Sequence, residues 1–207
     1  MAEIISPITR QVTKGSQESV TSSVEINLKD VENCLIYDGN GVSIPFRTLY
    51  QDRKSVIIFV RNFLCYSCKE YVDDLGKIPR EVLEQFCLLT GYPYEIYVDP
   101  ERCIYQKLGM KREETFTGSA QPSSHVKSGV FMGQMKSVWR AMTSPAFDFQ
   151  GDLHQQGGAI IAGPGSHVHF SHFDMNRLDH MPINWLLQLA GIQQTIDFSD
   201  KPKIIHV

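Results

Sequence analysis

A C-x-x-C motif, Cys65 and Cys68, constrains the fold of this chain more than any other feature. An apolar, β-branched run at 56–60 precedes the motif, and apolar residues at helical spacing follow it. This order predicts a strand that leads into the first turn of a helix. The two sulfurs then lie about one helical turn apart and can close a small disulfide with little backbone movement. The N–H groups of that turn favour the thiolate form of the first sulfur.

The composition is that of a folded domain of ordinary size. The chain has 207 residues, of which 42% are hydrophobic and 21% charged, as in typical globular proteins. The net charge of -3 gives no electrostatic reason to expect nucleic acid or an anionic membrane as a partner. No apolar stretch reaches the roughly 20 residues of a membrane span. We expect the polar segment 1–24 to be a mobile tail and 25–207 to form the domain.

The cysteine count bears on the cellular compartment. The chain has five cysteines, an odd number, and its N-terminal segment has no apolar core of the signal-peptide type. This pattern argues against a framework of structural disulfides and for a reducing environment. We therefore expect a cytoplasmic protein, with the nucleus as an additional location.

Strand-like and helix-like segments alternate along the chain. The 56–60 run does not alternate between apolar and polar residues, so we expect an inner parallel strand buried on both faces. The pattern as a whole predicts a single α/β domain with a three-layer, thioredoxin-like fold. The expected strands are 34–37, 42–44, 56–60, 94–98 and a closing hairpin of 159–162 and 167–170. The expected helices follow Cys65, Pro79, Pro100 and Pro182, with a further helix at 130–142.

Several segments of the chain resemble the peroxiredoxin-like 2 family, which carries the alkyl hydroperoxide reductase/thiol-specific antioxidant (AhpC/TSA) domain. The resemblance covers nearly everything after about Val31 and implies a peroxiredoxin-like form of the thioredoxin fold with a role in redox homeostasis. The matching segments are 63–72 (FLCYSCKEYV), 89–92 (LTGY), 95–102 (EIYVDPER), 108–112 (LGMKR), 147–152 (FDFQGD), 176–180 (NRLDH) and 204–207 (IIHV).

Two features depart from the pattern that the resemblance implies. Typical peroxiredoxins place a Thr three residues before the peroxidatic Cys and a Pro further upstream, where this chain has Asn62 and Ile58. The second departure is a gap around Leu83 to Phe86, where family members have a strand, a loop and part of a helix. That strand would lie beside 56–60 in a right-handed βαβ unit. We therefore expect a shortened chain that lacks one inner strand and is less stable than its relatives.

The motif supplies the candidate catalytic residues. Cys65, directly before the helix, is predicted to be the nucleophile, and Cys68 the thiol that resolves its oxidised form. Arg61 and Lys69 flank the motif, where their charges either lower a thiol pKa or are solvated at the surface. Two alternatives remain for the pair: a zinc half-site, which would need two further ligands, and two buried thiols that only pack in the core.

The other cysteines and the histidines carry weaker signals. We expect the isolated cysteines to pack in the core or at the surface, with a distal resolving role as the alternative; they are Cys34, Cys87 and Cys103. The histidines cluster late in the chain but lack a recognisable metal-ligand spacing, so we interpret them as polar residues of strand edges rather than metal ligands. The cluster consists of His154, His167, His169, His172 and His180.

The sequence favours a thiol–disulfide oxidoreductase or weak thiol peroxidase that needs no metal or organic cofactor. Its partners would be a peroxide or disulfide substrate and a cellular thiol reductant. The alternative is a non-catalytic, redox-linked regulatory protein that acts by binding a protein partner in signalling or metabolic control. The missing Thr and Pro and the long irregular segments 113–129 and 144–158 favour that alternative.

Overall fold

The computed structural model of the chain describes residues 26–62, 65–78, 95–115, 123–129, 132–133, 135 and 152–198. The expected tail, the helix after Pro79, the gap around 83–86 and most of the helix at 130–142 lie outside these residues.

A three-stranded antiparallel sheet forms the centre of the described part. Its strands are β3 (Ser55–Phe59), β4 (Gly158–Ala162) and β5 (Val168–Phe173), in the order β3-β4-β5. The predicted closing hairpin is confirmed as β4 and β5, which are joined across a cis Gly163–Pro164 bond. The turn needs glycine at Gly163, where φ is +88° and a Cβ would meet the Tyr50 carbonyl oxygen at 2.2 Å.

The β3 strand differs from its expected pairing. It pairs antiparallel with β4, and no other described strand lies along its second edge. Its three central residues are half-buried, whereas all five residues of β4 are buried. The expectation of parallel pairing is therefore not met by any strand that the structure describes. The apolar run at 56–60 indicates that both faces of the strand are covered by other elements. It does not determine which strands pair with it or in which direction.

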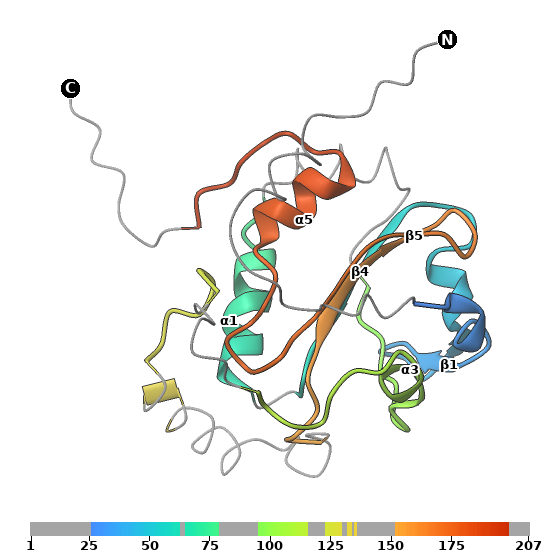
Figure 1. The fold of residues 1–207 in the computed structure, drawn as a ribbon, viewed down its shortest axis with the longest axis horizontal. Helices are drawn as coiled ribbons and strands as arrows, with labels where there is room; N and C mark the ends of the chain where they lie inside the picture. The colour runs from blue at the N-terminus through green and yellow to red at the C-terminus, as the bar shows by residue number, and fades with distance from the viewer. Residues whose placement is uncertain are drawn as a thin grey trace, which may run out of the picture.

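The two faces of the sheet are covered by different elements, which gives three layers (Figure 1). On one face lie η2 (Leu28–Asp30), the hairpin of β1 (Leu35–Tyr37) and β2 (Ser43–Pro45), η3 (Phe46–Leu49) and α3 (Cys103–Lys107). Their core includes Phe46, Ile104 and Ile160. On the other face lie α1 (Tyr66–Leu75) and α5 (Ile183–Ala190), whose core includes Tyr71 and Leu187.

The helices begin and end close to the predicted positions. The helix α1 starts directly after Cys65, and α5 starts after Pro182 and ends at Gly191, where φ is +107°. The helix α3 is shorter than expected, because Arg102 before it has a left-handed φ of 55°. The expected strand 94–98 contributes only a bridge between Val98 and Tyr37. No described helix has both the length and the apolar character that a membrane crossing requires.

Candidate redox site

The structure brings both cysteines of the motif to the start of α1. Cys65 is the residue before the helix, and Cys68 lies in its first turn. Cys65 is 8% exposed and Cys68 is 4% exposed. The Cys65 carbonyl accepts the first helical hydrogen bond from the Lys69 N–H at 3.0 Å. The predicted placement of the pair after a strand and at the start of a helix is confirmed, with β3 ending at Phe59 and α1 beginning at Tyr66.

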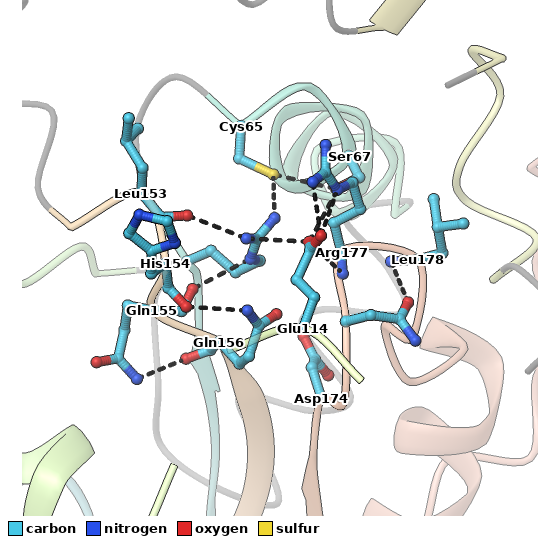
Figure 2. Close-up of polar contacts among 12 residues, drawn as sticks. Cys65, Ser67, Glu114, Leu153, His154, Gln155, Gln156, Asp174, Arg177 and Leu178 are labelled. Carbon is cyan, nitrogen blue, oxygen red and sulfur yellow. Dashed lines mark hydrogen bonds and ion pairs between the residues drawn. The ribbon is translucent and has the colours of Figure 1, made fainter. Parts of the chain in front are cut away.

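Three side chains surround the Cys65 sulfur, and Figure 2 labels one of them, Ser67. The thiol of Cys68 forms a hydrogen bond with it, the Ser67 hydroxyl lies 3.1 Å away and Arg61 Nη1 lies 3.6 Å away. The pKa of Cys65 is lowered to about 4, and the hydrogen bond with Cys68 is the largest cause. The Ser67 hydroxyl, the Cys68 backbone N–H and the Arg61 charge lower the pKa further, whereas burial raises it. Cys65 is therefore a thiolate at neutral pH.

The Cys68 thiol has the opposite character. Its hydrogen bond with Cys65, followed by burial, raises the pKa of Cys68 well above its ordinary value. One sulfur of the motif thus carries the negative charge, and the other keeps its proton and donates it to the first. A nucleophile beside a resolving thiol would need this asymmetry, and the division of roles between the two residues stays a prediction.

Arg61 is held in place by residues from the far end of the chain (Figure 2). Its Nε donates to the Gln155 carbonyl and its Nη2 to the Leu153 carbonyl, both at 3.1 Å. Its Nη2 also lies 3.2 Å from Glu114 Oε1. Glu114 is itself bound by Arg177, with 2.6 Å between Arg177 Nη2 and Glu114 Oε2. These contacts leave Arg61 8% exposed, so its guanidinium is a fixed part of the site and not a solvated surface charge.

Lys69, the other cation that flanks the motif, does not take part in the site. It lies on the exposed side of α1, with about half of its side chain accessible, and pairs with Asp73 one turn further along. Of the two interpretations of these flanking charges, lowering the thiol pKa holds for Arg61 and surface solvation holds for Lys69. No motif or spacing pointed to Glu114, Leu153 or Gln155, which meet Arg61 only through the tertiary fold, or to Arg177, which binds Glu114.

Cys68 also faces a small cavity behind the motif. The cavity has a volume of about 10 Å³ and is lined by Cys68, Tyr71, Asp174 and His180 among others, which is room for about one water molecule. His180 Nδ1 lies 2.7 Å from Asp174 Oδ2, and His180 Nε2 is buried without a hydrogen-bond partner among the described residues. Burial raises the pKa of the Asp174 carboxyl. A hydrogen-bonded Asp–His pair thus lines the same cavity as the Cys68 thiol.

The other histidines of the predicted cluster do not gather into a site in the part of the chain that the structure describes. His169 Nε2–H donates a hydrogen bond to the Gly163 carbonyl at 2.6 Å, and the rings of His167 and His169 pack edge to face. His172 Nε2 lies 2.9 Å from the Asp179 carbonyl, and the His154 N–H donates to Asp152. Within the described residues, no three His, Cys, Asp or Glu side chains are grouped as metal ligands.

Comparison with known proteins finds relatives that align with the whole chain or nearly all of it. A family model for an AhpC/TSA antioxidant enzyme matches residues 75–176. The peroxiredoxin-like 2C of Takifugu rubripes is 68% identical, over all of this chain and all of that protein. The chain belongs to the peroxiredoxin-like 2 family. The human peroxiredoxin-like 2C is 47% identical over 97% of this chain and 98% of that protein. No solved structure matches.

A more distant relative shares most of the chain as well. The prostamide/prostaglandin F synthase of Xenopus tropicalis is 26% identical over 86% of this chain and 94% of that protein. The AhpC/TSA match implies the predicted thioredoxin-like fold and a redox domain. The matched residues begin at Leu75 and so do not include Cys65 or Cys68.

The length of the alignment agrees with a shortened chain. The comparison with the Takifugu protein runs over 227 positions, whereas this chain has 207 residues. About 20 positions of that relative therefore have no counterpart here. A strand of about five or six residues with its connection fits within a difference of this size.

Proposed function

We propose that this protein reduces peroxides or disulfides through Cys65 and Cys68. The observation that carries the proposal is the environment of the buried Cys65 sulfur, which is hydrogen-bonded to Cys68 and Ser67 and faces the guanidinium of Arg61. A sulfur in such a setting is a thiolate at neutral pH and is the nucleophile that both reactions need. A cytoplasmic thiol reductant completes the proposed cycle.

The reaction with a peroxide has two steps. The Cys65 thiolate attacks one peroxide oxygen, the O–O bond breaks, and the leaving oxygen takes a proton and departs as water or an alcohol. Cys65 is then a sulfenic acid. The Cys68 sulfur attacks it, so that an S–S bond forms, the S–O bond breaks and water leaves. The Cys68 proton leaves with that oxygen in the water, and the Asp174–His180 pair that lines the same cavity is placed to relay it.

The disulfide formed in the second step must be reduced before another cycle. Two equivalents of a low-molecular-weight thiol, or one protein dithiol, return both cysteines to the reduced state by exchange. A disulfide substrate enters by the same route, because the Cys65 thiolate then attacks a sulfur instead of an oxygen. Neither route draws on a group beyond the chain, the substrate and the reductant.

The reactivity of Cys65 is expected to be independent of pH across the neutral range. A thiol whose pKa is about 4 in the folded protein is ionised at every pH above that value, whereas a free cysteine ionises only near pH 8.5. Alkylation by iodoacetamide should therefore proceed at a constant rate, after correction for the reagent, from about pH 5 to pH 8 and slow only as the pH falls through about 4.

Two matched variants sharpen this pH measurement. Arg61→Gln removes the buried charge and should move the midpoint upward, whereas Lys69→Gln removes an exposed charge and should leave it unchanged. A wild-type midpoint near 8.5 would contradict the proposed environment of Cys65.

The function itself is tested by oxidising the fully reduced protein with hydrogen peroxide. We expect loss of both thiols of the C-x-x-C motif and a peptide in which Cys65 is linked to Cys68, at a rate well above that of free cysteine at the same pH. Consumption of peroxide should continue when a thiol reductant is supplied. A rate equal to that of free cysteine, with no linked peptide, would reject the proposal.

A redox-linked regulatory protein that acts by binding is the second candidate function. The observation that favours it is the burial of both sulfurs, which limits their contact with large substrates. Asn62 in place of the Thr of typical peroxiredoxins is consistent with it. A partner that binds the double variant Cys65→Ser, Cys68→Ser as tightly as it binds the wild type would support this candidate over the enzymatic one.

A further inference from the structure

A second pair of cysteines lies in contact on the opposite face of the sheet. The sulfurs of Cys34 and Cys103 are 3.2 Å apart, although the two residues are 69 positions apart in the chain. Cys34 directly precedes β1 and Cys103 begins α3, two elements that lie next to each other in Figure 1. The expected packing is confirmed for both residues, since Cys34 lies in the core and Cys103 packs against it. Their contact with each other was not expected, because the tertiary fold brings together two segments that carry no common motif.

The backbone holds both cysteines in position. Cys34 donates its N–H to the Val31 carbonyl at 3.0 Å and accepts from the Phe46 N–H at 2.8 Å. Cys103 donates its N–H to Asp99 Oδ1 at 3.1 Å. Tyr37 and Val98, which lie a few residues from the two cysteines, exchange two backbone hydrogen bonds at 2.8 and 2.9 Å. The two segments are thus joined independently of the sulfurs.

A small movement completes a covalent link. The sulfurs of a disulfide are about 2.0 Å apart, so the pair must approach by roughly 1.2 Å from its present distance. Side-chain rotation about Cα–Cβ supplies a displacement of this size without a shift of the backbone.

The two thiols differ in accessibility. Cys34 is 8% exposed and belongs to the hydrophobic core of its layer, and burial followed by the Cys103 contact raises the pKa of Cys34. Cys103 is partly exposed and packs against that core. A reagent in solution therefore reaches Cys103 before it reaches Cys34. Cys34 is the more buried thiol of the pair, and its raised pKa favours the protonated form.

We propose that Cys34 and Cys103 are a second redox site, which closes a disulfide between β1 and α3 when the protein meets a hydroperoxide. The Cys103 thiolate attacks the peroxide oxygen, the O–O bond breaks, and the other oxygen leaves with a proton as water or an alcohol. The Cys34 sulfur then displaces the oxygen of the Cys103 sulfenic acid, and water leaves with the Cys34 proton. The two thiols supply the two electrons, and a dithiol reductant reverses the reaction.

The test uses the full-length chain with Cys65→Ser and Cys68→Ser, so that failure of the first site does not affect the result. After titration with hydrogen peroxide, peptides are mapped by mass spectrometry without reduction. We expect a peptide linking Cys34 to Cys103, and a thermal midpoint that rises by roughly 5–10 °C and falls again with dithiothreitol. The same chain with Cys34→Ser in addition is the control and should show neither change.

The wild-type chain provides a second measurement in case the variant does not fold. Oxidised wild-type protein should contain the Cys34–Cys103 peptide as well as the Cys65–Cys68 peptide. Oxidation of Cys103 to sulfinic acid without any link, or a link from either cysteine to Cys87 instead, would overturn the proposal. Formation of the Cys34–Cys103 link in a chain whose C-x-x-C pair is inert would show that the two sites act independently.

Discussion

Replacing Cys65 by serine should reduce peroxide consumption to the rate that the Cys34–Cys103 pair supports alone, whereas replacing Cys68 by serine should leave the first oxidation at Cys65 intact and stop its turnover. A serine hydroxyl is not ionised at neutral pH, so the Cys65→Ser chain has no nucleophile at the site. In the Cys68→Ser chain the new hydroxyl still donates to the Cys65 sulfur, and that hydrogen bond is the largest cause of the low pKa of Cys65. Its Cys65 sulfenic acid should therefore form at nearly the wild-type rate and accumulate.

A third variant separates the hydrogen bond from the resolving chemistry. Cys68→Ala removes both the donor and the second thiol, so the pKa of Cys65 should rise and the first step should slow at neutral pH. The measurement is stopped-flow consumption of hydrogen peroxide, with dimedone labelling of the sulfenic acid. Equal first-step rates in Cys68→Ser and Cys68→Ala would show that the Cys68 proton does not stabilise the thiolate. Unchanged peroxide consumption in Cys65→Ser would remove Cys65 from the mechanism.

Restoring the missing segment should stabilise the protein by several kcal/mol. The described part of the sheet ends at β3, whose central residues are only half-buried although the run is entirely apolar. A strand along that edge would pair its backbone groups and cover apolar surface. Each buried backbone group that gains a partner avoids a penalty of about 1–3 kcal/mol. At this chain length each kcal/mol corresponds to about 2–4 °C in thermal midpoint, so a rise of roughly 10 °C is expected.

The experiment inserts the corresponding segment of the Takifugu rubripes relative between Leu83 and Phe86. Thermal and urea unfolding of both chains are then compared under reducing conditions, so that no disulfide contributes. A matched control carries an insert of equal length made of Gly and Ser, which should lower stability slightly through loop-closure entropy. Equal midpoints for the original and restored chains would show that the present sheet is complete without the segment.

Local chemistry made parts of this structure predictable. The start of α1 at Cys65, the end of α5 at Gly191 and the β4–β5 hairpin follow from turn residues, helix-ending glycines and apolar runs that act over short distances. The position of β3 was also predicted to within a residue. Its pairing was not, because the composition of a strand reports which faces are covered and not which strands are neighbours.

The parts of the site that escaped prediction depend on distant contacts. Arg61 gave an ambiguous signal, since a cation beside a motif is solvated as often as it is buried. Its state is decided by Glu114 and by two carbonyl groups more than 90 positions away. The contact of Cys34 with Cys103 likewise depends on how β1 packs against α3. Neither pair has a spacing that a sequence pattern would reveal.

The way in which Arg61 is held has a consequence during synthesis of the chain. The carbonyls of Leu153 and Gln155 lie 92 and 94 positions beyond Arg61, so a ribosome has yet to make them when the C-x-x-C first leaves its exit tunnel. A growing chain therefore has the local contacts of Ser67 and Cys68 with the Cys65 sulfur before it has a fixed guanidinium beside that sulfur. The contribution of the Arg61 charge to the Cys65 pKa is thus added only when residues 153–155 fold back onto Arg61.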